Sequence, residues 1–119
     1  MVDRRRALGT LGEDVVARWY RAQGYTVLDR NWRVRGGELD LVLGRGRTVV
    51  FCEVKTRRGD AFGTPFEAIT PAKQQRLRTL ALQWLSEHRR AAREVRFDVA
   101  AVRIAGADPP LIEVRTNVF

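Results

Sequence analysis

The stretch that most constrains the fold is residues 37–56, which read GELDLVLGRGRTVVFCEVKT. Two runs with strand character flank a glycine-rich segment at residues 44–47, and this pattern predicts a β-hairpin with a four-residue turn. Alternate residues of a strand point to the same face. One face of the hairpin is apolar along its whole length, so we expect it to belong to the core. Its residues are Leu39, Leu41, Leu43, Val50, Cys52 and Val54.

The opposite face of the hairpin is apolar near the turn and charged at the far end, where it carries Glu38, Asp40, Glu53 and Lys55. The four-residue turn places Glu38 opposite Glu53 and makes Asp40 a diagonal neighbour of Glu53, roughly 7 Å away at the backbone. A bulge at either glycine of the turn would slip this register by one residue. Carboxylates this close repel one another. The cluster therefore requires a cation. Lys55 supplies one positive charge, and a hard divalent ion such as Mg²⁺, which prefers oxygen ligands, would supply more.

The chain has a net charge of +8 and a sequence pI near 11.1, which indicates an anionic partner. Nucleic acid is favoured over a membrane surface because no amphipathic membrane-surface helix is evident. A basic surface that only aids solubility is the alternative. Just two of the 22 cationic residues are lysines, Lys55 and Lys73. Lysine is a compact point charge whose pKa can shift, so their positions suggest special roles, although the arginine bias can also reflect the coding genome.

The length of 119 residues predicts one domain spanning residues 1–119, with residues 1–8 as the candidate for a flexible N-terminus. We find no secretory signal and no apolar run approaching the ~20 residues of a membrane span. A single cysteine, Cys52, cannot form an internal disulfide. Together these features favour the cytoplasm and no membrane partner.

Hydrophobic periodicity predicts an α/β fold: a central mixed β-sheet flanked by helices, in the order α-β-β-β-α-β-β. The first helix is expected over residues 8–23, with Leu11 in its apolar stripe, and Glu13 reads as a first-turn acid that favours the helix dipole. The other expected segments are a strand at 25–31, a basic connection at 32–36, the hairpin, a loop at 57–70, a helix from 71 to about 90, and strands at 95–104 and 111–116. The second helix joins two strands and is expected to form a parallel crossover.

The second helix is expected to start with Thr70 as its N-cap and Pro71 at its first position. Lys73, Gln74 and Arg76 crowd its first turns. Cations there oppose the helix dipole, and a bound phosphate would relieve the conflict; a basic solvated face is the alternative. The lone His88 at the far end of this helix is interpreted as a surface residue, which makes zinc binding unfavoured.

Several blocks of the sequence resemble the PD-(D/E)XK nuclease superfamily, which has a restriction-endonuclease-like fold. Within it they resemble the YraN-like family of small bacterial proteins. The blocks are Gly12-Glu13, Gly24-Tyr25, Arg30-Asn31, the GELD sequence at residues 37–40, the FCEVKTR sequence at 51–57, Phe62-Gly63, Lys73, the RFDV sequence at 96–99 and the closing Asn117-Val118-Phe119. Leu39 stands where the superfamily signature has proline.

The resemblance implies a nuclease-like domain in which Asp40 is the metal-binding acid and Glu53 and Lys55 are the paired acid and lysine. Glu13 corresponds to the first-helix acid of archaeal Holliday-junction resolvases, and Lys73 to a basic or amide residue on the following helix. We therefore expect a metal-dependent endonuclease that acts on DNA in preference to RNA, including branched or damaged DNA.

Each candidate residue has an expected role in this reaction. Asp40, Glu53 and the Val54 carbonyl would hold Mg²⁺ or Mn²⁺, and Glu13 would complete the shell directly or through water. Lys55 would orient the attacking hydroxide or stabilise the transition state. The residues expected to hold flanking phosphates are Arg33, Arg35, Arg57, Lys73 and Arg76. Glu38 and Gln74 are expected just outside the metal shell, with Glu38 alternatively an ion-pair partner of a nearby arginine.

Two other functions remain open. The chain can be a non-catalytic nucleic-acid-binding module, which predicts salt-dependent binding that needs no metal. It can also be a protein-interaction or assembly factor whose acid cluster is a structural set of ion pairs. A homodimer is possible, but no self-complementary apolar patch establishes one.

Overall fold

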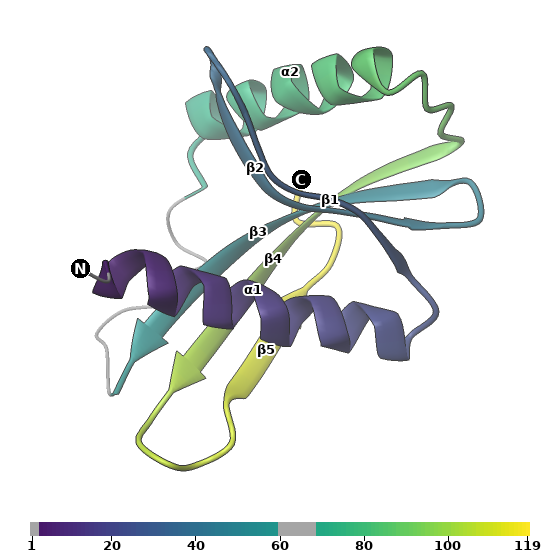
Figure 1. The fold of residues 1–119 in the computed structure, drawn as a ribbon. Helices are drawn as coiled ribbons and strands as arrows, with labels where there is room; N and C mark the ends of the chain where they lie inside the picture. Colours follow the sequence, from purple (N-terminus) through teal and green to yellow (C-terminus); the bar gives the residue numbers. More distant parts are fainter. Residues whose placement is uncertain (1–2, 60–68) are drawn as a thin grey trace.

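A computed structural model describes residues 3–59 and 69–119 of the protein. It contains a five-stranded sheet with one helix on each face (Figure 1). The elements are α1 (Arg4–Ala22), β1 (Thr26–Val34), β2 (Gly37–Arg45), β3 (Thr48–Arg58), α2 (Pro71–Glu87), β4 (Glu94–Ile104) and β5 (Leu111–Arg115). This is the predicted order of helices and strands.

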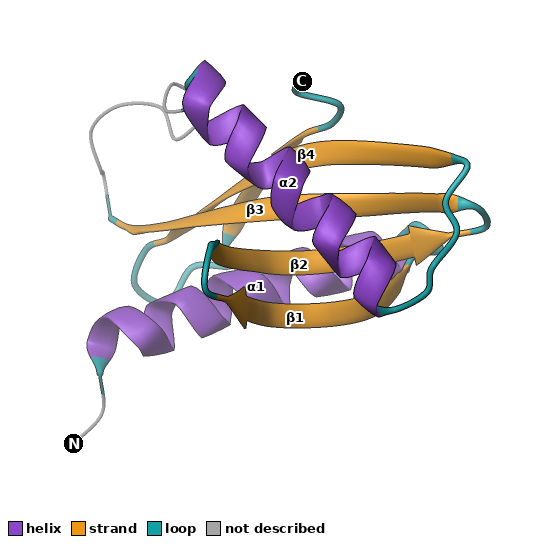
Figure 2. Ribbon diagram, turned by 90° about the horizontal axis from the view of Figure 1, so that it is seen from above, coloured by secondary structure: helices purple, strands orange, loops and turns teal. Residues whose placement is uncertain are grey.

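The strands lie in the sheet in their sequence order, from β1 to β5. Strands β3 and β4 are parallel and are connected through α2, whereas every other neighbouring pair is antiparallel. The predicted mixed sheet with one parallel crossover is therefore confirmed. Figure 2 shows α2 crossing one face of the sheet while α1 lies behind the other.

Helix α1 begins at Arg4, four residues earlier than the apolar pattern predicts, because the Asp3 carboxylate accepts hydrogen bonds from the Arg5 and Arg6 N–H groups. Of the candidate flexible end at residues 1–8, residues 4–8 form the first turns of this helix. The early start also places Glu13 in the middle of the helix, so it is not a first-turn acid. Leu11, expected in the buried stripe, is 49% exposed.

The β2–β3 hairpin has a tighter turn than predicted. Arg45 pairs with Thr48, so only Gly46 and Arg47 form the turn, and Gly46 has a positive φ of 59°. The predicted register was therefore wrong by two residues. Because side chains alternate with a period of two, a shift of two does not by itself move a residue to the other face.

Strand β1 continues to Val34, which pairs with Gly37 of β2. The predicted basic connection at residues 32–36 is therefore mostly strand, with a turn at Arg35 and Gly36. Arg57, predicted in a loop, lies near the end of β3 and pairs with Arg103 of β4. Most of that predicted loop, residues 60–68, lies outside the described residues.

The sheet separates two hydrophobic clusters. One lies under α1 and includes Val16, Tyr20, Leu41, Leu43, Val50 and Cys52. The other lies under α2 and includes Leu39, Val42, Val49, Phe51, Leu80 and Trp84. Burial of these side chains on both faces holds the layers together.

Helix α2 begins as predicted, with Thr70 accepting the Lys73 N–H at 3.2 Å and Pro71 at the first position. It ends at Glu87, three residues before the predicted end, and His88 caps it. His88 is exposed, as expected, and stacks on Trp84 with ring centroids 4.2 Å apart. No helix in the described ranges is long and apolar enough to cross a membrane.

A buried carboxylate ties the C-terminal segment to the sheet. Asp98 of β4 is 2% exposed and accepts hydrogen bonds from the Tyr20 hydroxyl at 2.5 Å and the Asn117 N–H at 3.0 Å. The Arg96 guanidinium donates to both of its oxygens, at 2.9 Å each. A buried carboxylate requires such partners, and here they come from α1, β4 and residues 117–119. The bonds therefore join these three parts of the chain.

Two glycines of α1 provide a test of how closely this helix packs on the sheet. A Cβ added to Gly12 would overlap the side chain of Thr56 on β3, whereas a Cβ at Gly9 meets nothing within 4 Å. We expect Gly12→Ala to destabilise the protein by about 1–3 kcal/mol through overpacking. Gly9→Ala should stabilise it by up to about 1 kcal/mol, because alanine is the better helix former. Denaturant unfolding measures both, and equal shifts for the two variants would contradict this packing.

Candidate metal and phosphate site

In β1 and β2, the regular alternation of side chains between the two faces of the sheet is interrupted at the level of Asn31 and Asp40. Leu41 packs in the cluster under α1, but Leu39 packs in the cluster under α2, so the side chains change face around Asp40. This corrects the prediction that Leu39 and Leu41 share a face. On β1, Asn31 lies between two residues paired to β2 and has a φ of 50°. Asparagine tolerates this left-handed conformation better than most residues.

Asp40 lies where the β2–β3 ladder ends. The last recorded pair is Leu41 with Cys52, and beyond it the Asp40 carboxylate accepts the Val54 N–H at 2.9 Å. A side chain thus replaces a backbone carbonyl as the acceptor for β3.

Burial raises the pKa of Asp40 from its ordinary value of 3.8 to about 6. The hydrogen bond from Val54 lowers the pKa, but it does not cancel burial, and the nearby charges of Glu13, Glu53 and Glu38 raise the pKa further. A nearby cation would therefore stabilise the charged form of the Asp40 carboxylate.

Glu53 is held by both lysines of the chain. Its Oε1 atom lies 3.0 Å from Lys55 Nζ and 2.7 Å from Lys73 Nζ, whereas its Oε2 atom is buried and has no hydrogen-bond partner. Burial alone would raise the pKa of Glu53, but the two lysines outweigh it and lower that pKa. Burial likewise would lower the pKa of Lys55, but Glu53 raises it. Lys55 is thus charged at neutral pH.

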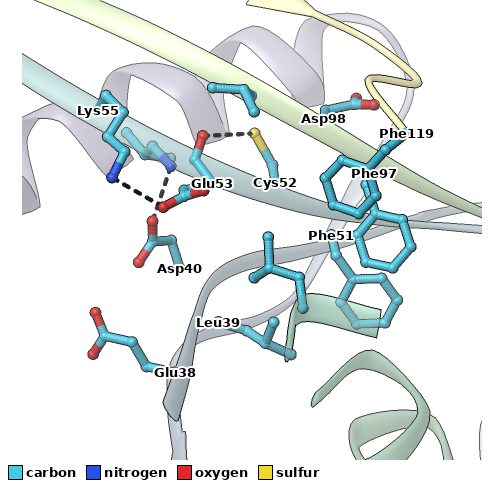
Figure 3. Close-up of a pocket in the computed structure, with 13 residues that line it drawn as sticks. Glu38, Leu39, Asp40, Phe51, Cys52, Glu53, Lys55, Phe97, Asp98 and Phe119 are labelled. Carbon is cyan, nitrogen blue, oxygen red and sulfur yellow. Dashed lines mark hydrogen bonds and ion pairs between the residues drawn. The ribbon is translucent and has the colours of Figure 1, made fainter. Parts of the chain in front are cut away.

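The four charged residues of the hairpin lie around one cavity, although the alternation that was expected to bring them together is interrupted at Asp40. Glu38, Asp40, Glu53 and Lys55 all line one cavity of about 220 Å³ (Figure 3). In Figure 3 the carboxylates of Glu38 and Asp40 lie on one side of the cavity, and three phenylalanine rings lie on the other. The cavity therefore has a polar end and an aromatic end.

Glu13 lies close to this site but lines a different cavity. It is 8% exposed and accepts a hydrogen bond from Asn31 Nδ2 at 2.9 Å. The neighbouring cavity, about 450 Å³, is lined by Arg6, Gly9, Thr10, Glu13, Asn31, Arg33 and Glu38. Glu38 borders both cavities. The charge of Glu13 reaches Asp40, but the two carboxylates do not share one pocket.

The other candidate residues either contact neighbouring groups or have exposed side chains. Arg33 pairs with Glu38 across β1 and β2, and its Nε atom lies 3.0 Å from Glu38 Oε2, so Glu38 has the arginine partner that was one of its two predicted roles. Gln74 Nε2 donates to the Ile69 carbonyl at 3.4 Å. The side chains of Arg35, Arg57 and Arg76 are exposed, on the β1–β2 turn, on β3 and on α2.

The chemistry of these groups fits a hard divalent cation. Asp40 and Glu53 offer oxygen donors, and the buried Glu53 Oε2 has an unused lone pair. Within residues 3–59 and 69–119 no three histidine, cysteine, aspartate or glutamate side chains gather as a metal cage. Mg²⁺ does not require one, since it usually keeps several waters and binds through one or two carboxylates plus substrate phosphates.

Some contacts around the site were not foreseen from the sequence. The role of Asn31 as the partner of Glu13 was missed, although an asparagine between strand residues signals a position with positive φ. The Asp98 network was missed as well. An isolated aspartate within an apolar strand, two residues after an arginine, is the signal that could have indicated it.

The raised pKa of Asp40 predicts that neutralising this residue stabilises the metal-free protein. Between pH 3.8 and 6 the native state binds a proton that the unfolded chain does not, so charged Asp40 lowers the unfolding free energy above pH 6. We expect Asp40→Asn to be more stable than the wild type by about 1–2 kcal/mol at pH 7, with the gap closing toward pH 4. Asparagine can still accept the Val54 N–H.

Denaturant unfolding in a chelator, repeated from pH 4 to pH 7.5, measures this gap. Asp108→Asn, on the exposed turn between β4 and β5, is the control and should show no such trend. A stability difference between Asp40→Asn and wild type that does not vary with pH would contradict the assignment.

Comparison with known proteins places the chain in a bacterial family. The model of the Uncharacterised protein family UPF0102 matches residues 12–102. A UPF0102 protein of Rhodococcus opacus (strain B4) is 51% identical over 113 residues, covering 95% of this chain and 96% of the relative. A UPF0102 protein of Geobacter sulfurreducens is 45% identical over 114 residues, covering 96% and 89%. The chain therefore belongs to the UPF0102 family.

Proposed function

We propose that the protein is a metal-dependent nuclease that hydrolyses phosphodiester bonds at the polar end of the cavity. The observation that carries this proposal is the buried Glu53 Oε2 atom, which has no hydrogen-bond partner and lies in the same site as Asp40. A buried acceptor without a partner is costly unless something else binds it. The order of elements and the acid-acid-lysine set also agree with the PD-(D/E)XK superfamily.

Asp40, Glu53 and the Val54 carbonyl would hold Mg²⁺ or Mn²⁺, with Glu13 acting through water from the neighbouring cavity. A bound ion of this kind lowers the pKa of a coordinated water and neutralises charge on the phosphate. The Val54 N–H fixes the orientation of the Asp40 carboxylate. This preorganisation limits the rearrangement that binding requires.

Lys55 would stabilise the negative charge that develops on the phosphate. Its ammonium group is held at the cavity by Glu53 and is charged at neutral pH. The group is therefore better suited to electrostatic stabilisation than to removing a proton from water. This favours one of the two roles that the sequence left open for Lys55.

The basic surface would hold the flanking phosphates. Arg35, Arg57 and Arg76 have exposed side chains, and the chain carries a net charge of +8. Lys73 contacts Glu53, so it can reach a phosphate only by changing partners. Such contacts position the backbone of a nucleic acid without reading its sequence. The superfamily resemblance favours DNA over RNA as the substrate.

One observation favours the alternative of a non-catalytic nucleic-acid-binding module. Glu53 already has two lysine partners, which compensate its charge without any metal ion. A module of this kind would bind nucleic acid through the basic surface, and its affinity would fall with salt concentration and be insensitive to Asp40.

Cleavage assays on branched, nicked and single-stranded DNA and on RNA distinguish these functions. With Mg²⁺ or Mn²⁺ we expect cleavage by the wild type. Asp40→Asn and Lys55→Ala should each lower the rate at least about 100-fold, the loss typical of removing one electrostatic group from an active site. Chelation should abolish the activity.

Asp108→Asn is the matched control, because it removes an exposed carboxylate outside the cavity and should leave the rate unchanged. Cleavage that survives both Asp40→Asn and Lys55→Ala would overturn the site. Binding without cleavage, unaltered by Asp40→Asn, would favour the non-catalytic module.

A further inference from the structure

The aromatic end of the cavity is a stack of three phenylalanine rings from separate parts of the chain. Phe51 of β3 stacks on Phe97 of β4 with ring centroids 5.7 Å apart, and Phe97 stacks on Phe119 at 4.7 Å. The interplanar angles are 27° and 18°. Phe51 is buried, whereas Phe97 and Phe119 are only partly buried. The stack therefore runs from the core to the accessible wall of the cavity (Figure 3).

The backbone fixes the position of the last ring in this stack. The Val118 N–H donates to the Phe97 carbonyl at 2.8 Å, and the Asn117 N–H donates to the buried Asp98 carboxylate at 3.0 Å. Asn117 has a φ of 55°, which turns the chain back toward β4. Two hydrogen bonds, one of them to a buried charge, thus hold Phe119 beside the cavity.

A cation lies over the same ring. The guanidinium carbon of Arg78, an exposed residue of α2, is 5.5 Å from the centroid of Phe119. Arg78 lies outside the lining of the cavity, whereas Leu39 and Leu77 belong to that lining. Flat aromatic rings, an arginine plane and aliphatic walls are the groups on which nucleobases stack.

We propose that this end of the cavity binds one unpaired nucleobase, stacked on Phe119, while the phosphate of the same strand lies at the acidic end. Phe97 already stacks on Phe119, so the exposed Arg78 side chain moves off the ring to admit the base. This inference rests on the proposed function and names its substrate class. The cavity of about 220 Å³ is smaller than the roughly 300–1,000 Å³ of drug-sized ligand sites, so it suits a single flat ring system. A base inside a duplex has both faces stacked and cannot enter. The preferred substrate is therefore single-stranded or locally unpaired nucleic acid.

Binding measured in a chelator tests the stacking site without requiring cleavage. A fluorescently labelled single strand and its matched duplex are titrated with each protein, and anisotropy gives the dissociation constants. Phe119→Leu keeps the apolar contact with Phe97 but removes the aromatic face, so it should weaken single-strand binding by about 5- to 150-fold, the range for one lost base stack. Phe119→Tyr should restore it.

Duplex binding should change less than twofold in every variant, because it depends on phosphate contacts. Leu111→Ala is the control, since Leu111 is 65% exposed on β5 and lies outside the cavity. Unchanged single-strand binding by folded Phe119→Leu, equal losses on single strand and duplex, or no single-strand binding by the wild type would each overturn the proposal.

A measurement on the wild type avoids any effect of substitution on folding. A single strand carrying 5-iodouracil is photocross-linked to the protein, and mass spectrometry maps the attachment. We expect it on Phe119 or Phe97, and a cross-link confined to residues outside the cavity would overturn the proposal. If these tests fail, the stacking proposal is overturned but the proposed nuclease function still stands on the cleavage assay. If single strands stack on Phe119 but are not cleaved, only the nuclease assignment is overturned.

Discussion

The hydrogen bond from the Val54 N–H to the Asp40 carboxylate holds the candidate site together. Strands β2 and β3 stop pairing beyond Leu41 and Cys52, and at that level a side chain supplies the acceptor that a neighbouring strand would normally supply. This substitution keeps Asp40 beside Glu53 while the ladder opens into a cavity. The site is thus a consequence of how the hairpin ends, and it is built on a sheet that is packed on both faces.

The electrostatic balance of the site explains why its charges can be buried. Burial, together with the charges of the nearby acids, raises the pKa of Asp40 to about 6. Glu53 is also buried, but Lys55 and Lys73 lower its pKa. The chain has only these two lysines among 22 cationic residues, and both contact the same oxygen. A compact ammonium group suits this role, since it can change partners more readily than a bidentate arginine.

Much of the fold could be predicted from hydrophobic periodicity. An error in strand pairing moves a side chain to the other face of the sheet only if the error is an odd number of residues. The hairpin slipped by two residues from the predicted pairing, so Glu53 and Lys55 kept their face. The change of face at Leu39 could not be predicted, because it depends on a local irregularity shared with Asn31. The contact between Lys73 and Glu53 also required the tertiary structure, since 20 positions separate them in the sequence.

Diffraction from crystals soaked in Mn²⁺ tests the central claim most directly. The anomalous signal locates the ion without reference to catalysis or substrate. The account predicts an ion between the Asp40 carboxylate and the Glu53 Oε2 atom, which has no hydrogen-bond partner in the protein, and predicts its loss in Asp40→Asn crystals. A fully soaked crystal with no ion at this position, and with Lys55 and Lys73 still on Glu53, would show that the acid pair is a structural set of ion pairs.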